Sequence, residues 1–262
     1  MMKHWYLGTI GFSYKEWVGP FYPAGTTARD YLPYYSKIFN ALELDTTFHS
    51  IPPRASVEGW NNTVPLDFKF CPKTPRSVTH ELRLKGAEGI MAEFLDALSP
   101  IKQKLGPILI QLPPSFRQEN YPILQNFLEA LPHTYRYAVE FRHASWYNDK
   151  TTELLRRHQV GWVAVDFPKI PRKIIPTTDF MFLRWIGVNG MYQGHSYERI
   201  DTTGQLHWWL QAMQEFYPQI PVVYGFFNND YAGYAAGTCQ RFMLLAGLID
   251  PSQDLPYQER LF

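Results

Sequence analysis

The sequence predicts an α/β fold, a single (β/α)8 barrel or TIM barrel built from eight parallel strands. Short strand-like runs alternate with longer runs whose apolar residues recur at helical spacing, which is typical of repeated βα units. Eight strand-like runs occur within 262 residues, and both the number and the length suit one such barrel. Because no Gly/Ser-rich linker or charge block interrupts the alternation, we expect residues 1–262 to form a single domain.

The predicted strands are short runs rich in aliphatic and aromatic residues, which favour extended backbone. Prolines fall mostly between these runs and mark the boundaries of elements. In chain order the strands are Trp5 to Ile10, Ala41 to Asp45, Asp67 to Lys73, Ile108 to Gln111, Tyr137 to Arg142, Trp162 to Asp166, Phe180 to Arg184 and Val222 to Phe227.

Helical spacing of apolar residues predicts a helix in seven of the connections. The connection between strands six and seven, Phe167 to Asp179, contains three prolines, so we expect an irregular crossover there. The predicted helices are Arg29 to Phe39, Ser56 to Thr63, Gly86 to Lys104, Tyr121 to Ala130, Asp149 to His158, Gly204 to Tyr217 and Tyr231 to Leu248.

Alternation along each strand predicts which side chains point into the barrel, because successive residues face opposite sides. In the second strand Leu42 and Leu44 would face the helices, which directs Glu43 and Asp45 inward. The same rule places polar residues at seven consecutive strand ends, the end at which barrel enzymes bind their substrates. The predicted inward residues are Glu43, Asp45, Lys69, Lys73, Gln111, Glu140, Arg142, Asp166 and Arg184, followed by Asn228, Asn229 and Asp230. The opposite charges among them could also form a purely structural ion network.

The overall charge limits the classes of partner. Lys and Arg number 25 against 24 Asp and Glu, a formal net charge of +1, so no broad field attracts nucleic acid or anionic lipid. We therefore expect a small polar or anionic ligand, with nucleic acid not favoured and no membrane partner; the oligomeric state is not predicted. The sequence contains two cysteines and no paired-Cys or HExxH motif of the kind that binds a metal. No apolar run reaches the roughly 18 residues that a membrane-spanning helix needs. We accordingly expect a cytoplasmic protein with no metal and no cofactor.

Aromatic residues gather in the predicted loops after the strands. The segment GTIGFSYKEWVGPFYP contains five aromatic rings after the first predicted strand, and Trp146 follows the fifth predicted strand. Such rings could wall the mouth and stack on a sugar or a base, or they could pack the loops against one another.

Six segments together resemble the YecE-like family, also called domain of unknown function 72. They are GTIGFSYKEWVGPFYP, LELDTTFHSIP, FKFCPKTPRSVTHELRL, LGPILIQLPPSF, AVEFRHASWY and FFNNDYAGYAA, in the same order along nearly the whole chain. The resemblance implies a TIM barrel with no established reaction. It places the characteristic polar positions of the family at Glu43, Lys73, Thr79, His80, Gln111, Glu140, Arg142, Ser145, Asn228 and Asn229. This chain departs from the family pattern at Asp45, where Asn is expected, and at His49, where Tyr is expected.

The leading functional hypothesis is a hydrolase or lyase that acts on a phosphate-bearing sugar or nucleotide-like substrate. Lys73, Arg142 and Arg184 would clamp the anion, since guanidinium forks match phosphate oxygens. Glu43 or Glu140 would serve as general acid or base. The remaining candidate substrate-binding residues are Asp45, His80, Gln111, Trp146, Asp166, Asn228 and Asn229.

Three other functions are open at this stage. A glycosidase would use Glu43 and Glu140 as its paired carboxylates. A Schiff-base enzyme would use Lys73 as the nucleophilic amine. A binding or scaffold protein would use the same pocket without catalysis.

Overall fold

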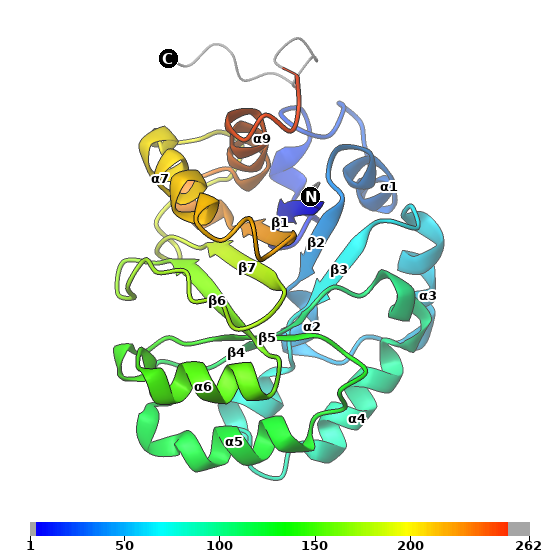
Figure 1. The fold of residues 1–262 in the computed structure, drawn as a ribbon. Helices are drawn as coiled ribbons and strands as arrows, with labels where there is room; N and C mark the ends of the chain where they lie inside the picture. Colours follow the sequence, from blue (N-terminus) through cyan, green and yellow to red (C-terminus); the bar gives the residue numbers. More distant parts are fainter. Residues whose placement is uncertain (1–3, 251–262) are drawn as a thin grey trace.

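The computed structural model describes residues 4–250, in which eight parallel strands are surrounded by helices (Figure 1). The predicted number of strands is confirmed within this part of the chain, and two of the eight predicted strands match residue for residue. The strands are β1 (His4–Thr9), β2 (Ala41–Leu44), β3 (Lys69–Pro72), β4 (Ile108–Gln111), β5 (Tyr137–Glu140), β6 (Gly161–Asp166), β7 (Phe180–Trp185) and β8 (Val222–Phe227).

The prediction of a closed eight-stranded barrel is wrong. The strands form a six-stranded parallel sheet in the order β1-β8-β7-β6-β5-β4 and a separate two-stranded sheet of β2 and β3. Among the described residues the backbones next to the two sheets are joined only by isolated β-bridges. These bridges pair Ile10 with Glu43, Phe70 with Leu105, and Lys73 with Leu109. The fold is α/β, and it contains no continuous ladder around eight strands.

Side chains occupy the seam between β1 and β2, which is why no ladder forms there. The Asn40 side chain accepts from Leu7 N at 2.9 Å and donates to Trp5 O at 2.7 Å. The Tyr35 hydroxyl accepts from Thr9 N at 2.8 Å and donates to Ala41 O at 3.0 Å. These bonds satisfy backbone groups that a neighbouring strand would otherwise pair.

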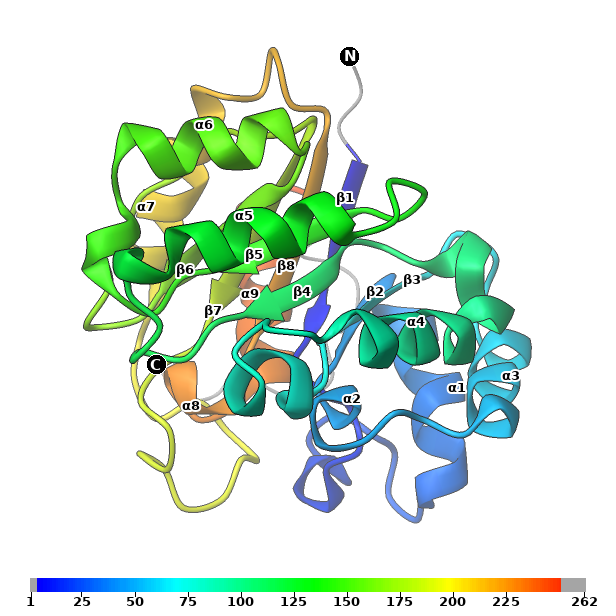
Figure 2. The same ribbon diagram turned by 90° about the horizontal axis from the view of Figure 1, so that it is seen from below.

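The helices lie outside the strands, and Figure 2 shows the short α2 and α8 at the end toward which the strand arrows point. None of the helices between residues 4 and 250 is long and apolar enough to cross a membrane. The α-helices are α1 (Ala28–Ile38), α2 (Thr46–His49), α3 (Arg54–Thr63), α4 (Glu88–Ala97), α5 (Tyr121–Ala130), α6 (Asp149–Arg157), α7 (Thr203–Gln214), α8 (Asn229–Ala232) and α9 (Ala235–Leu245). Short 3-10 helices lie at Lys15–Trp17, Ser99–Lys104, Gln118–Asn120 and Ala144–Trp146, and a π-helical turn, η2, at Ser77–Glu81.

Two predicted helices are each divided in the structure. The helix expected over Gly86 to Lys104 ends at Ala97, and a 3-10 helix with Pro100 in its first turn follows. The helix expected over Tyr231 to Leu248 is divided by Gly233, whose φ of 99° ends α8 before α9 begins. The irregular crossover between β6 and β7 is confirmed, since residues 167–179 contain no helix.

Two buried apolar clusters confirm most of the predicted strand orientations. Ala41, Cys71 and Ala138 belong to the inner cluster, while Leu42 and Val139 belong to the outer cluster against the helices. In β6 the predicted orientation is wrong, because Val163 and Val165 lie in the inner cluster and Asp166 therefore faces the helix layer. All six residues of β6 are buried, so the sequence GWVAVD offers no polar face from which to read the alternation.

Candidate functional site

Several of the polar residues predicted at the strand ends meet, and their centre is a chain of buried ion pairs. The Arg184 guanidinium donates from Nε to Glu43 Oε2 at 2.8 Å and from Nη2 to Glu43 Oε1 at 2.7 Å. Its Nη1 donates to Glu140. We call Glu43, Arg184 and Glu140 the central ion chain. Its members come from β2, β7 and β5, so it links the two separate sheets.

The central ion chain is too deeply buried to contact a ligand. The side chains of Glu43 and Glu140 are 0% exposed and that of Arg184 is 3% exposed. All three guanidinium nitrogens of Arg184 donate to the two carboxylates. The predicted role of Arg184 as an anion clamp thus lacks a donor group that could turn toward a substrate.

The two carboxylates differ in how much positive charge they contact. Desolvation opposes the ionisation of Glu140, but Arg142 and Arg184 outweigh it and lower its pKa to about 2. Burial raises the pKa of Glu43, because Arg184, which it shares with Glu140, offsets only part of the desolvation. Glu140 is therefore the carboxylate held most firmly in the charged state.

A second layer, closer to solvent, consists of Lys73, His80 and Arg142, and we call it the rim. The Lys73 ammonium donates to Asp45 Oδ1 at 2.9 Å and lies 4.0 Å from the centroid of the Phe48 ring. Asp45, at a position where the family resemblance leads us to expect Asn, is 37% exposed and has a pKa that Lys73 lowers against the effect of burial. The pair of Lys73 and Asp45 thus sits at the boundary with solvent.

Arg142 is held at one end only. Its Nε donates to the buried Glu140, and its guanidinium lies 4.7 Å from the centroid of the Phe167 ring. Neither Nη atom has a hydrogen-bond or ion-pair partner in the described part of the chain. The side chain of Arg142 is 13% exposed, so part of it reaches solvent. Gln111, which pairs with Glu140 in the ladder, is also half-buried and beside this group.

His80 lies in the π-helical turn η2, which follows β3. Its Nδ1 is 2.8 Å from the hydroxyl of Thr79, and its ring meets the Phe48 ring edge-on at 5.0 Å. Burial and, after it, four nearby cations lower the pKa of His80 to about 4. These cations are Lys73, Arg76, Arg142 and Arg83. The charges with the largest effect on His80 are therefore positive.

Two predicted site residues lie elsewhere. Asp166 accepts hydrogen bonds from Trp209 Nε1 at 2.8 Å and the Tyr231 hydroxyl at 2.9 Å, within the helix layer. Trp146 is 0% exposed, and its Nε1 donates to Phe116 O at 2.7 Å. Neither side chain lines the polar cluster, because Asp166 points outward from β6 and Trp146 stacks between Phe116 and Phe141.

The predicted amide cluster after β8 shapes the backbone. Asn228 Oδ1 accepts from Asp230 N at 2.9 Å, and Asn229 Oδ1 accepts from Ala235 N at 2.9 Å. These bonds hold the starts of α8 and α9 and use the Oδ1 acceptors of both amides, and Asn229 is 3% exposed.

Most rings of the first aromatic loop pack rather than line the mouth. Trp17, Phe21 and Tyr22 are buried and contact one another edge-on or tilted. Tyr14 is the exception, since desolvation and then the charges of Asp45, Glu43 and Asp230 raise its pKa, which places it beside the polar cluster.

The sequence did not point to Arg76 and Arg83, two further cations whose charges act on His80. Arg83 has a φ of 52° and donates to the hydroxyl and the carbonyl of Ser115 at 2.9 and 3.1 Å. Neither residue is in a predicted strand, so strand alternation gave no signal for them.

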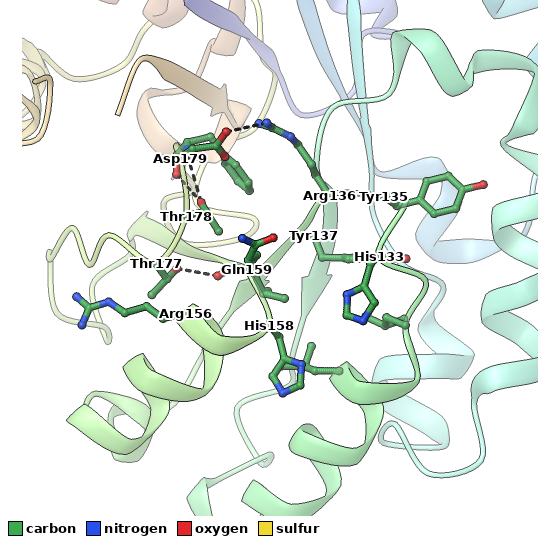
Figure 3. A pocket seen from close by; sticks show the side chains of 14 residues that line it. His133, Tyr135, Arg136, Tyr137, Arg156, His158, Gln159, Thr177, Thr178 and Asp179 are labelled. Atoms are coloured by element: carbon green, nitrogen blue, oxygen red, sulfur yellow. Dashed lines mark hydrogen bonds and ion pairs between the residues drawn. The ribbon is translucent and has the colours of Figure 1, made fainter. Parts of the chain in front are cut away.

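A separate hollow lies at the opposite, amino end of β5, β6 and β7 (Figure 3). It has a volume of about 560 Å³ and is lined by residues such as His133, His158 and Gln159. The pair of Arg136 and Asp179, 2.8 Å apart, borders it. Strand alternation does not predict this hollow, because much of its lining comes from the segments that precede β5, β6 and β7.

No group of three His, Cys, Asp or Glu side chains in residues 4–250 is arranged to hold a metal ion. The carboxylates of the polar cluster are instead paired with Arg and Lys. Cys71 and Cys239 are both buried free thiols.

Comparisons with known proteins agree on one family. Residues 6–259 match the family model described as "Protein of unknown function DUF72". The chain is 27% identical over 237 residues to the UPF0759 protein YecE of Escherichia coli K12, covering 81% of this chain and 82% of that protein. It is 26% identical to the UPF0759 protein YunF of Bacillus subtilis, covering 98% and 99%. A crystal structure of a DUF72 family protein from Thermotoga maritima superposes with a TM-score of 0.82 at 33% identity, covering 93% of this chain and 99% of that one.

Proposed function

The chain belongs to the DUF72 family of proteins of unknown function, and we propose that it is a hydrolase or lyase acting on a phosphate-bearing sugar or nucleotide-like substrate. The substrate would bind at the rim, above the central ion chain. The observation that carries this proposal is the arrangement of Arg142, anchored through Nε to a buried carboxylate with both Nη atoms unpaired within residues 4–250.

This arrangement suits an oxyanion. A guanidinium that is fixed at Nε presents its two Nη groups as a fork, and a fork matches two oxygens of a phosphate. The conformational cost of ordering the Arg142 side chain is met in the folded protein, so little remains to be spent when a ligand binds.

The charges around Arg142 support the same ligand class. Lys73 contributes a second cation on the rim, and its contact with Asp45 uses one of its three N–H groups. Arg83 adds a cation whose side chain donates to the neutral hydroxyl and carbonyl of Ser115. The acids Glu43 and Glu140 are fully buried, so among the carboxylates of the cluster only Asp45, paired with Lys73, reaches solvent beside these cations.

The two other catalytic hypotheses gain no support from the geometry. A glycosidase needs two carboxyl groups on either side of a sugar, whereas Glu43 and Glu140 bind opposite sides of one buried guanidinium. Schiff-base formation needs an uncharged amine, whereas the ion pair with Asp45 and the Phe48 ring are contacts suited to an ammonium group at Lys73.

Anion binding can be measured before any substrate is identified. Inorganic phosphate is titrated into the full-length protein by isothermal calorimetry or by observing amide chemical shifts. Arg142→Ala is expected to weaken binding about tenfold to a hundredfold, the loss typical of hydrogen bonds to charged groups. Arg142→Lys, which keeps the charge and removes the fork, should give an intermediate loss.

The matched control is Arg29→Ala, because Arg29 is an exposed residue of α1. It should bind phosphate as the wild type does. Equal phosphate affinity for the wild type and Arg142→Ala would refute the proposed binding site. Screening phosphate monoesters and diesters for turnover then tests the enzymatic part of the proposal, and binding without turnover of any would favour the non-catalytic alternative.

A further inference from the structure

We propose that His80 is the residue that accepts and returns a proton at the rim. This inference rests on the proposed function of the same site and adds to it the group that performs acid–base chemistry. It is carried by the position of the imidazole, by the contacts that fix it and by the pairing of every nearby carboxylate.

The position of His80 depends on an unusual backbone. Residues Ser77–Glu81 form a π-helical turn in the connection that follows β3, and such turns are rare and occur frequently at functional sites. Within this turn Thr79 is fully buried and His80 is half-buried. The turn thus holds one polar side chain inside and presents the next at the surface of the site.

Thr79 orients the ring of His80. The Thr79 hydroxyl lies 2.8 Å from Nδ1 of His80 and 3.5 Å from Pro75 O. If the hydroxyl donates to Nδ1, Nε2 carries the ring proton; if it donates to Pro75 O, Nε2 is the unprotonated acceptor. The two arrangements differ by rotation of one hydroxyl and by the tautomer, so the pair can serve both the accepting and the donating state.

Phe48 places the imidazole beside the anion-binding groups. One ring of Phe48 contacts the Lys73 ammonium, 4.0 Å from its centroid, and the His80 ring, 5.0 Å away and edge-on. Nε2 of His80 has no hydrogen-bond partner in the described residues. Lys73 and Arg142 are both among the cations whose charges act on the His80 ring, so an anion bound to them would act on the same ring.

The other ionisable groups of the site are committed. Glu43 and Glu140 are buried and bound to Arg184, and Asp45 is paired with Lys73. The charges that lower the pKa of His80 are those of Lys73, Arg76, Arg142 and Arg83, of which Lys73 is paired with Asp45 and Arg76 lies 3.5 Å from Glu81. Together with burial they keep the ring neutral near pH 7, with a pKa of about 4, so that it is able to accept a proton.

A bound anion would change this balance. The negative charge of the ligand offsets the cations, which raises the affinity of the ring for a proton when substrate is present. In the hydrolysis of a phosphate monoester, a water oxygen forms the new P–O bond while the ester P–O bond breaks. Nε2 takes one proton from that water and returns one to the leaving oxygen, so the ring ends as neutral as it began.

Sulfate tests the coupling between anion binding and proton binding. Sulfate keeps the same charge between pH 4.5 and 7.5, whereas the charge of phosphate changes over this range. The histidine ring signals of the full-length protein are followed by NMR over this range, with and without saturating sulfate. The pKa of His80 should rise by about one unit or more when sulfate binds, the shift typical of an opposite charge at 4 to 6 Å. Sulfate affinity should correspondingly increase several-fold from pH 7.5 to pH 4.5.

Three variants locate this effect. His80→Gln should still bind sulfate at pH 7.5 but lose the additional affinity at pH 4.5. His207→Gln, an exposed histidine of α7, should behave as the wild type. Thr79→Val, which removes the hydroxyl at nearly constant volume, should alter the pH profile without abolishing sulfate binding.

The outcomes separate the two proposals. If sulfate does not bind the wild type, or binds without dependence on Arg142, the proposed function fails. If sulfate binds through Arg142 but the His80 signals do not shift and His80→Gln keeps the wild-type pH profile, only the role of His80 is overturned. With any phosphate ester that is turned over, His80→Gln should lower kcat by about 10²-fold or more with a smaller change in KM.

Discussion

The central ion chain and the rim contain the same kinds of side chain, but they differ in burial and in the number of donors that remain unused. Arg184 is 3% exposed and gives every guanidinium nitrogen to Glu43 and Glu140, while Arg142 gives only Nε. An arginine in the first state links strands from two sheets, and one in the second can bind a ligand. The comparison shows that charge at a strand end does not by itself identify a binding residue.

The largest effect should follow from removing the shared cation of the central ion chain. Arg184→Met leaves two buried carboxylates without their common partner, and we expect a loss of about 3 to 5 kcal/mol in the free energy of unfolding. Urea unfolding followed by circular dichroism measures it. Arg142→Met, at the rim, should lose less than half as much. Equal losses for the two variants would remove the distinction between centre and rim.

The second effect depends on pH and concerns Glu140. Its pKa is about 2 in the folded protein against an ordinary value of 4.5, so its ionisation contributes stability above about pH 4.5 that is lost as the pH falls toward 2. Glu140→Gln lacks this contribution at every pH. The stability difference between wild type and Glu140→Gln should therefore shrink between pH 7 and pH 3, by at most about 3 kcal/mol.

Urea midpoints at several pH values test this. The useful reference is Asp45→Asn, because Asp45 is half-exposed and should give a smaller change over the same range. A difference between wild type and Glu140→Gln that stays constant from pH 7 to pH 3 would contradict the strong pairing of Glu140.

The alternation of apolar and polar residues was sufficient to predict the strands and much of this cluster. It placed Glu43 and Glu140 on the inner faces of β2 and β5, where the structure has them. It failed for Asp166, because β6 is buried on both faces and shows no alternation. It also could not distinguish Arg184 from Arg142, since the pairing of each guanidinium depends on strands distant in the sequence.

The alternation of apolar and polar residues also could not predict the missing ladder between β1 and β2, and the reason is different. The Tyr35 hydroxyl and the Asn40 amide replace ladder bonds there. Tyr35 lies in the last turn of α1 and Asn40 follows this helix, whose apolar pattern predicts only its packing. Gly8 permits this insertion, because a Cβ at that position would lie 1.9 Å from Ala41 O and 2.5 Å from the Tyr35 hydroxyl. A side chain that takes the place of a backbone partner has no periodic signature.

The third prediction concerns the rim alone. Lys73→Met should reduce sulfate affinity about tenfold, while the free energy of unfolding changes by no more than about 1 kcal/mol because Asp45 remains partly hydrated. Lys37→Met, on the exposed face of α1, is the control for loss of a positive charge far from the site. A large loss of stability in Lys73→Met with unchanged sulfate affinity would assign Lys73 to the structural centre.

The smallest effect distinguishes the rim from the centre by its sign. The pKa of Glu140 is lowered because its charged form is stabilised, whereas that of His80 is lowered to about 4 because burial and nearby cations disfavour its charged form. Between pH 6.5 and pH 4 the unfolded chain binds a proton at His80 more strongly than the folded protein does, so this residue makes the wild type less stable as the pH falls. His80→Gln should therefore gain stability relative to wild type between pH 7.5 and pH 4.5, by less than about 1 kcal/mol since solvent screens a half-exposed ring. His207→Gln should show no such gain in the same unfolding series, and a His80→Gln variant that loses relative stability toward low pH would mean that the ring is stabilised as a cation and cannot serve as the proton acceptor.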